Sequence, residues 1–499
     1  MTQPLLHEYS DLLAHLLDTA AQHNVYLIAR LQRIESRSVT VANGKTEGIA
    51  TALAQGIGMH VFDREGHTAF AAIDQLTRAQ TEEALRSAIA GLHAAAQADL
   101  QRNTAIFDVE PTVAVEVPPT PYTLDALPLE RVQALVEEIN AEVMGYGAAD
   151  SQRVKVRTPF YIDREEWRIV RSDGTDVSYL LPHGYCFNST TVQHNGTAHT
   201  VNSSLSRTGY EVLLDDRELL MLRAQKAVET AQQLVSAPRY PAGAYPIIMD
   251  YAMAKGLAHE AFGHAAETDG LRTSILSRDG AFRVGEQMAA PIVTIVDEPV
   301  VGDHAYQPFS PNGIRRSRAT ILNAGVLQDA LADLFSAKAA GTRVIDAGRA
   351  QSYGSVPVPR MTNIRIELPD AYPMAGRFEE QTPEDVRAAL LNAGLLKAGH
   401  PVIYLAGYKG GQVSPAQGDF VFNCAALWEL SVEGVRLFQP AIFSGQTRAA
   451  LQAIAAGFGP LQLDAMGFCG KAGQSVPSSG GSHYFLYLEP SPAVLIGGA

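Results

Sequence analysis

Hydrophobic positions near the N-terminus switch between helical and strand periodicity. Leucines at helical spacing predict a helix over about residues 7–23. Apolar and polar residues then alternate in short segments on both sides of Asn43-Gly44, a dipeptide typical of a tight hairpin turn, which predicts a β-meander. Helical spacing returns from Thr81, which we expect to be the N-cap, and again from about Leu129. The strands predicted in the meander are 25–32, 38–41 and 48–55.

A second block of alternating residues, between about 153 and 205, predicts an antiparallel sheet with turns at Asp173-Gly174 and Asn195-Gly196. A long helix is predicted after it, over about 216–235. Three prolines then fall within residues 235–246 and interrupt the regular pattern. We therefore predict two domains, an N-terminal domain of residues 1–238 and a C-terminal domain of residues 239–499.

The second half opens with a predicted strand at 245–250 that runs directly into a helix. A further strand is predicted at 291–297, a helix at Thr382 with a capping-box-like start, and a glycine-rich tail at the end. Helices and strands occur in blocks rather than in strict alternation. This favours an α+β fold, with helices and an antiparallel sheet in the first domain and an α+β arrangement in the second.

Composition narrows the function and the compartment. The 499 residues carry a net charge of -14 and no Lys/Arg-rich run, which argues against direct nucleic-acid binding. No segment has the roughly 18 apolar residues needed to cross a bilayer, and the first residues do not resemble a signal peptide. The odd number of cysteines (Cys186, Cys424 and Cys469) suits a reducing compartment. We expect a cytoplasmic protein that does not associate with membranes.

The segment HEAFGH places His259, Glu260 and His264 in a pattern with one residue more than the ordinary zincin motif. Histidines four apart share a helix face, whereas five apart they diverge by roughly 140° on an ideal α-helix. The two histidines can converge on one metal if the helix ends near Gly263 or contains a π-bulge. The alternative is a helix that carries three polar residues and no metal, but its Ala/Gly/Phe-rich surroundings argue against that.

A catalytic zinc site needs three protein ligands and an open position for water. Glu267 can share a helix face with His264. Cys469 lies in a predicted glycine-rich loop, where Lys471 would favour the thiolate, and is therefore the preferred third ligand. Cys186 and Cys424 lie in strand-like apolar runs, which predicts that they are small buried hydrophobes. The candidates for the third ligand are Glu267, His304, His483 and Cys469.

Several motifs, taken in order, resemble the TldD/PmbA family of metallopeptidases, also called modulators of DNA gyrase, and in particular its catalytic TldD-like branch. The resemblance is strongest from about residue 246 to the C-terminus and weaker in the N-terminal half, in NGKTEGIATALAQGIGMHVF and near Ser172-Asp173-Gly174. The motifs that carry it are HEAFGHAAETD, TIVDEP, SAKAAG, PRMTN, GGQVSPAQGDFVF and CGKAGQSVP.

The resemblance implies that His259, His264 and Cys469 bind zinc and that Glu260 is the catalytic acid/base. It also implies a two-domain α+β fold, a homodimer or a heterodimer with a paralogous subunit, and cleavage of short or unfolded peptides. In some systems these peptides are leader segments of ribosomally made natural products. One departure is Phe309–Gly313, which stands where the family often has an acidic Asp-Glu-Gly segment and bears on substrate preference.

The predicted function is thus that of a zinc-dependent peptidase in which Glu260 takes a proton from the attacking water. The sequence does not identify the donor that stabilises the oxyanion; His304, His483 and Lys471 are candidates, although each of these residue types is more often structural. The run Gly410–Gln412 is either a plain turn or a strand edge where an extended peptide pairs. Two alternatives remain: a zinc hydrolase acting on a non-peptide amide in a biosynthetic pathway, and a non-enzymatic regulatory adaptor with a structural metal. A base beside a ligand argues against the adaptor.

Overall fold

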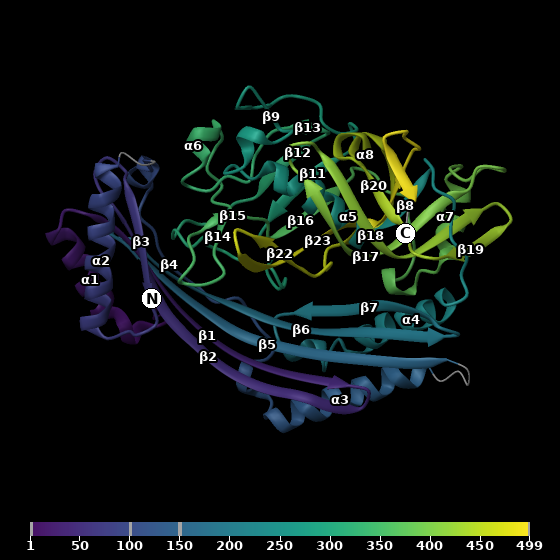
Figure 1. Cartoon of the computed structure of the whole chain (residues 1–499), viewed down its shortest axis with the longest axis horizontal. Helices are drawn as coiled ribbons and strands as arrows, with labels where there is room; N and C mark the ends of the chain where they lie inside the picture. Colours follow the sequence, from purple (N-terminus) through teal and green to yellow (C-terminus); the bar gives the residue numbers. More distant parts are fainter. Residues whose placement is uncertain (1–2, 99–101, 148–151, 498–499) are drawn as a thin grey trace.

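The computed structural model describes residues 3–98, 102–147 and 152–497, which fold around two large β-sheets (Figure 1). The first sheet has seven strands in the order β3-β2-β1-β5-β6-β4, with β7 also paired to β6. The second has thirteen strands and contains β8 and most of the strands that follow. The predicted α+β fold is confirmed. The strands of the first sheet end at Arg207 and those of the second begin at Ile247, while the division into domains at residue 238 stays a prediction.

Long antiparallel strands form the first sheet. Asn43 and Gly44 both have positive φ, 50° and 74°, as the tight turn between β1 and β2 requires. The predicted strands 25–32 and 38–41 are parts of one strand, because residues 33–37 stay paired with β2 and β5 even though their pattern is more polar. The strands are β1 (Tyr26–Ala42), β2 (Lys45–Phe62), β3 (Thr68–Ile73), β4 (Val113–Glu116), β5 (Arg153–Arg171), β6 (Asp176–His194) and β7 (Thr197–Arg207).

Four helices accompany the first sheet. α1 (Ser10–Gln22) and α2 (Arg78–Gln97) share one hydrophobic core with β1 and β2, and α3 (Leu129–Tyr146) and α4 (Arg217–Leu234) share another with β5 and β6. The prediction of Thr81 as the N-cap of α2 is wrong. Thr77 is the cap and accepts from the Gln80 amide, whereas Thr81 is buried and its hydroxyl donates to the Thr77 carbonyl. Within the described ranges, no helix is both long and apolar enough to cross a membrane.

The second sheet is built around β8 (Ile247–Asp250), which pairs in parallel with β17 and antiparallel with β23. The strand predicted at 291–297 is found as β11, and the helix predicted at Thr382 is found as α7 with a reciprocal Thr382–Asp385 capping box. The other strands are β11 (Thr294–Glu298), β12 (Ala319–Asn323), β13 (Val326–Leu327), β16 (Asn363–Glu367), β17 (Val402–Ser414), β18 (Asp419–Ser431), β19 (Gly434–Phe438), β20 (Ile442–Gln446), β21 (Ile454–Gln462), β22 (Gly467–Lys471), β23 (Gln474–Leu488) and β24 (Val494–Gly497).

The prediction that Cys469 lies in a glycine-rich loop is wrong, because β22 and β23 form a hairpin there. A Cβ on Gly480 would lie 1.8 Å from the Ile364 carbonyl oxygen, so this glycine lets β23 approach β16 closely. The smaller elements are α5 (Tyr251–Gly256), α6 (Ala337–Ala340), α7 (Pro383–Asn392), α8 (Thr447–Ala453), and the two-stranded sheets of β9 (Ser277–Arg278) with β10 (Ala281–Phe282) and β14 (Gly348–Arg349) with β15 (Val358–Pro359).

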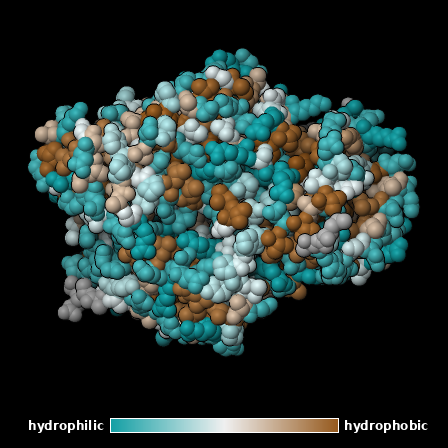
Figure 2. All heavy atoms as spheres, turned by 180° about the vertical axis from the view of Figure 1, so that it is seen from behind, coloured by the Kyte–Doolittle hydropathy of each residue, from teal (hydrophilic) through white to brown (hydrophobic). Residues whose placement is uncertain are grey.

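The segment Phe309–Gly313 lies against the first sheet. Its Phe309 ring stacks on Tyr179 with centroids 6.0 Å apart, and its Pro311 carbonyl accepts from Arg30 Nε at 2.5 Å. The Asn312 side-chain oxygen accepts a hydrogen bond from Arg30, and its backbone carbonyl accepts one from Arg171. This stretch, which departs from the family pattern, therefore joins the two parts of the fold. On the face seen from behind, apolar side chains gather in separate groups among hydrophilic ones (Figure 2).

Candidate metal centre

The helix after β8 changes its winding where the histidines lie. Asp250 caps it by accepting from the Met253 amide at 2.9 Å. The helix starts as α5, widens into a π-helical turn at Leu257–Gly263 and closes with a 3-10 turn at His264–Ala266. The π geometry brings residues five apart onto one face, and the imidazole centroids of His259 and His264 are 5.2 Å apart. Of the two geometries considered for this spacing, the π-bulge accounts for the convergence.

Cys469 lies on β22, which forms a hairpin with β23. Its side chain therefore reaches the two histidines from a strand and not from a loop. Its Sγ lies 3.6 Å from His264 Nε2, and one ligand atom from each of the three side chains lies within 4.8 Å of the others. His259 and Cys469 are buried, with 1% and 2% of their surface exposed. The fold thus brings together the three residues predicted as ligands.

The other candidates for the third ligand have different partners. Glu267 Oε2 lies 3.0 Å from His264 Nδ1, on the side of the ring away from Cys469, where a carboxylate orients a ligand rather than binding the metal. The His304 ring packs against other aromatic rings, and His483 Nδ1 lies 2.7 Å from the Gly459 carbonyl oxygen. The three belong to the surroundings of the site or to the core.

The two histidines of the centre lie in different electrostatic surroundings. Burial lowers the pKa of His264, but the charge of Glu267 and the hydrogen bonds with Cys469 and Glu267 outweigh it and raise the pKa to about 10. Burial lowers the pKa of His259 well below its ordinary value, which keeps this imidazole neutral, the form that binds metals. His259 Nδ1 is buried without a hydrogen-bond partner among the described residues. Two imidazoles and a thiol suit zinc, so the residues fit the implied metal.

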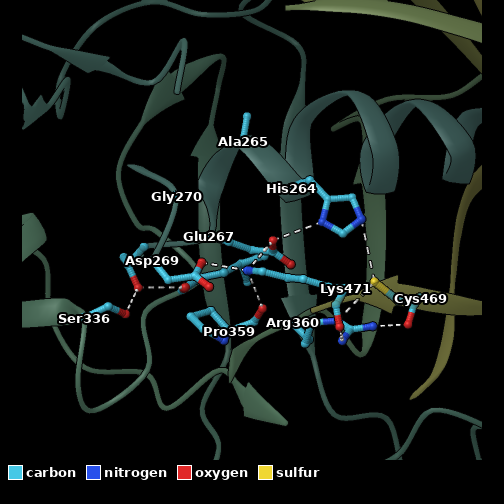
Figure 3. A network of polar contacts seen from close by, with 12 residues as sticks. His264, Ala265, Glu267, Asp269, Gly270, Ser336, Pro359, Arg360, Cys469 and Lys471 are labelled. Atoms are coloured by element: carbon cyan, nitrogen blue, oxygen red, sulfur yellow. Dashed lines mark hydrogen bonds and ion pairs between the residues drawn. The ribbon is translucent and has the colours of Figure 1, made fainter. Parts of the chain in front are cut away.

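Arg360, rather than Lys471, stabilises the Cys469 thiolate. Burial raises the pKa of the Cys469 thiol, but His264 and the Arg360 guanidinium outweigh that effect and leave it lowered. Arg360 Nε lies 3.3 Å from the sulfur, whereas Lys471 Nζ pairs with Glu267 at 2.9 Å and Asp269 at 2.6 Å (Figure 3). The prediction for Lys471 is therefore wrong. Arg360 is 109 positions from Cys469, and apart from its place in the PRMTN motif nothing in the sequence marks its role.

Glu260 differs from Glu267 in accessibility. The Glu260 side chain is 25% exposed and its Oε2 lies 3.6 Å from His264 Nε2, while the Glu267 side chain is 3% exposed. A carboxylate that exchanges protons with water must reach it, and Glu260 meets that condition.

The other two cysteines are buried, and the run Gly410–Gln412 belongs to a strand. Burial raises the pKa of Cys186 to about 12 and that of Cys424 to about 11, as suits the buried thiols predicted for both. Gly410–Gln412 is not a turn, since Gly411 and Gln412 pair with Phe422 and Val421 of β18.

Family models of the PmbA/TldA metallopeptidases match three successive parts of the chain: domain 1 over residues 29–96, the central domain over 122–235 and the C-terminal domain over 242–470. The chain belongs to the PmbA/TldD family. The metalloprotease TldD homolog of Haemophilus influenzae is 27% identical to this PmbA/TldD chain over 476 residues, which are 93% of this chain and 92% of that protein.

Two archaeal relatives match shorter regions. A metalloprotease of Archaeoglobus fulgidus is 34% identical over 276 residues, 55% of this chain and 58% of that protein. A zinc metalloprotease TldD homolog of Saccharolobus solfataricus is 28% identical over 252 residues, 48% of this chain and 50% of that protein. The matches span little more than half of the Archaeoglobus protein and half of the Saccharolobus protein.

Solved structures share the PmbA/TldD fold. A modulator of DNA gyrase from Bacteroides thetaiotaomicron superposes with a TM-score of 0.72 at 15% identity, over 98% of this chain and 99% of that one. TldE from Thermococcus kodakarensis superposes with a TM-score of 0.70 at 15% identity, over 98% and 100%.

Proposed function

We propose that this PmbA/TldD chain is a zinc-dependent peptidase. The observation that supports it best is the convergence of three metal-ligating atoms within 4.8 Å of one another, beside a partly exposed glutamate. Relatives named as metalloproteases support the same reaction class. Three ligands leave zinc an open position, as catalysis requires.

In this proposal His259, His264 and Cys469 hold the metal. Bound zinc would supply a Lewis acid and a water of lowered pKa. Glu260 takes a proton from the water as it attacks the scissile carbonyl, and then delivers it to the leaving amine. Glu267 holds the His264 ring so that Nε2 faces the ligand cluster, and Arg360 keeps the sulfur ionised.

The proposed substrates are short or unfolded peptides, among them leader segments of ribosomally made natural products. Two of the ligands are almost fully buried, so a scissile carbonyl comes close to them most readily on an extended chain. A folded substrate would have to open locally, at a cost in free energy.

We further propose that the chain works in the cytoplasm as a homodimer or as a heterodimer with a paralogous subunit. The three free cysteines support a reducing compartment. TldE of Thermococcus kodakarensis shares the fold, so a paralogue of similar shape is a reasonable partner to test.

Two other functions share the metal-binding residues. A hydrolase of a non-peptide amide would use the same zinc and the same base. A regulatory adaptor with a structural metal would not need Glu260, and its metal site would be closed by a fourth ligand. In the described part of the chain, the ligand group has three members, which favours an enzyme.

The test combines metal analysis with turnover of a mixed library of unfolded peptides, followed by mass spectrometry. We expect about one zinc per chain. Glu260→Gln should keep the zinc because the amide preserves shape, and should lower peptide turnover by about 10²–10⁴-fold because proton transfer is lost. Glu286→Gln, at a carboxylate paired with Arg283 near the surface, is the control. Near-native turnover by Glu260→Gln would refute the mechanism. A zinc protein that cleaves no peptide but hydrolyses small amides would support the biosynthetic alternative.

A further inference from the structure

Lys255 is a buried cation close to the metal centre, and the mechanism above does not use it. It belongs to α5 and is 6% exposed, in an otherwise apolar run that leads to His259. Its Nζ donates to Ser478 Oγ at 3.2 Å. In the parts of the chain that the structure describes, it forms no ion pair within 4.0 Å. An ammonium has three N–H groups, and burying it with one neutral partner is costly.

Lys255 lies against the strand that carries the ligand Cys469. A Cβ on Gly467 would lie 2.9 Å from Lys255 Nζ, so the ammonium rests against β22 two residues before Cys469. Burial lowers the pKa of Lys255, and the negative charges of Glu260, Cys469 and Asp303 act in the opposite direction without outweighing it. A buried lysine with spare N–H donors therefore lies beside the strand that carries the thiol ligand and within electrostatic reach of the general base.

We infer that Lys255 donates a hydrogen bond to the oxyanion formed when water attacks the substrate carbonyl, an inference that rests on the proposed peptidase function. In that step the water oxygen bonds to the carbonyl carbon and its proton passes to Glu260. The carbonyl π electrons move onto oxygen, where Lys255 donates a hydrogen bond and keeps its proton. When the C–N bond breaks, the electron pair returns to the carbonyl and the proton on Glu260 goes to the amine. Donors placed where charge develops are a large source of catalysis.

Tyr408 is the competing donor. Its hydroxyl is buried without a partner among the described residues, and the charge of Glu260 acts on it. However, its ring lies on the β17 side of the helix, where a Cβ on Gly256 would be 2.7 Å from it, while Lys255 lies against β22, which carries Cys469. The Lys255 ammonium also has N–H groups to spare beyond the one that Ser478 accepts. The geometry thus favours Lys255, and Tyr408→Phe becomes the comparison.

The experiment uses the zinc-loaded full chain, a peptide that the wild type cleaves, and the phosphinic analogue of that peptide, whose tetrahedral anion mimics the attacked carbonyl. Lys255→Met should lower kcat by about 10²–10³-fold with KM and zinc affinity unchanged, as expected when one oxyanion donor is removed. Calorimetry should show a similar loss of affinity for the phosphinic analogue. The affinity for the parent peptide is measured with the Glu260→Gln protein and with the Glu260→Gln/Lys255→Met double variant. The two proteins should bind it equally well.

Lys226→Met is the matched control, because Lys226 is a partly buried lysine on α4 that also donates to a neutral oxygen, the Gln381 carbonyl. It should leave all these quantities unchanged. Lys255→Gln keeps a neutral donor and should retain part of the activity, and it replaces Lys255→Met if the latter does not fold.

Three results would overturn the inference: equal loss of affinity for the analogue and the parent peptide, loss of zinc by Lys255→Met, or a selective loss in Tyr408→Phe alone. If the wild type cleaves no peptide, the proposed function fails first. Inorganic phosphate binding to the zinc-loaded wild type and Lys255→Met proteins then tests Lys255 separately. Weaker binding by Lys255→Met supports an anion donor, and equal binding overturns it.

Discussion

At the scale of single residues, the centre depends on how His264 is held. Glu267 contacts one ring nitrogen at 3.0 Å, and the other nitrogen faces the Cys469 sulfur at 3.6 Å. The Nδ1 contact orients the ring so that Nε2 points at the ligand cluster, and it is from Nε2 that a bound metal would displace the proton. Lys471 in turn pairs with Glu267, so the lysine acts on the carboxylate that orients the histidine rather than on the thiol.

We predict that Cys469→Ser and Glu267→Gln lower zinc affinity to different extents. Glu267→Gln removes a partner of a ligand and should cost about 10–100-fold in affinity, while Cys469→Ser removes a ligand and should cost more. Competition with a chromophoric chelator measures both. Unchanged zinc affinity in Cys469→Ser, together with loss of metal in Glu267→Gln, would reverse the two assignments.

At the scale of elements, the π-helical turn is the feature that makes a five-residue spacing workable. Gly263 ends that turn in a crowded place, where a Cβ would lie 2.2 Å from Met361 Sδ, 3.0 Å from Ile364 Cδ1 and 3.2 Å from the Ala258 carbonyl oxygen. The absence of a side chain lets the turn pack against β16 immediately before His264. The winding of the helix and the neighbouring strand are therefore coupled.

We predict that Gly263→Ala destabilises the fold by about 1–3 kcal/mol, the usual cost of overpacking, and weakens zinc binding because His264 is displaced. Gly470→Ala is the matched control, since a Cβ at that position meets nothing within 4 Å although it is next to Cys469. Denaturation and zinc titration compare the two variants. Equal behaviour would show that the turn tolerates a side chain at Gly263.

At the scale of the whole molecule, buried polar groups lie where the first sheet meets the second half of the chain. His183 of β6 lies 2.9 Å from the Asp163 carboxylate, and its ring is 5.5 Å from that of His304. Burial lowers the pKa of His183, but the charge and hydrogen bond of Asp163 outweigh it and raise the pKa above 6.5. Because Asp163 and His183 are opposite each other on β5 and β6, protonated His183 stabilises the pairing of these two strands beside His304.

This pair predicts a pH dependence of stability. The folded state holds the His183 proton more tightly than the unfolded state, so the stabilisation is complete below about pH 6.5 and is lost as the pH rises through the raised folded pKa. One group contributes at most about 1.4 kcal/mol per pH unit. The difference in thermal midpoint between wild type and Asp163→Asn should thus shrink as the pH rises. For Asp176→Asn, whose partner Arg168 stays charged, we expect a constant difference. Parallel curves for Asp163→Asn would contradict the assignment.

The proposed dimer is also a property of the whole molecule, and its mass in solution tests it. Light scattering of the purified chain at micromolar concentration should give about twice the mass of 53.6 kDa, or should do so once a paralogous subunit is added. A monomer with full peptidase activity would exclude an obligate dimer.

The sequence by itself determined the features that depend on neighbouring residues. The α+β class, the Asn43-Gly44 turn and the Thr382 capping box follow from periodicity, positive φ and side-chain bonds within a few positions. The pairing of His259 with His264 belongs here as well, although the spacing alone did not choose between a helix end and a π turn. Similar local signals also misled, since either Thr77 or Thr81 has the chemistry of an N-cap and only packing against the sheet buries Thr81.

Only the tertiary structure decided how distant residues meet. Cys469 lies 205 positions from His264, and the β22–β23 hairpin, rather than a glycine loop, brings them together. The roles of Arg360, Lys471 and Lys255 depend on the same hairpin. A charged side chain is attracted to whichever opposite charge the fold places beside it in a medium of low polarity, and nearness in sequence does not determine which charge that is.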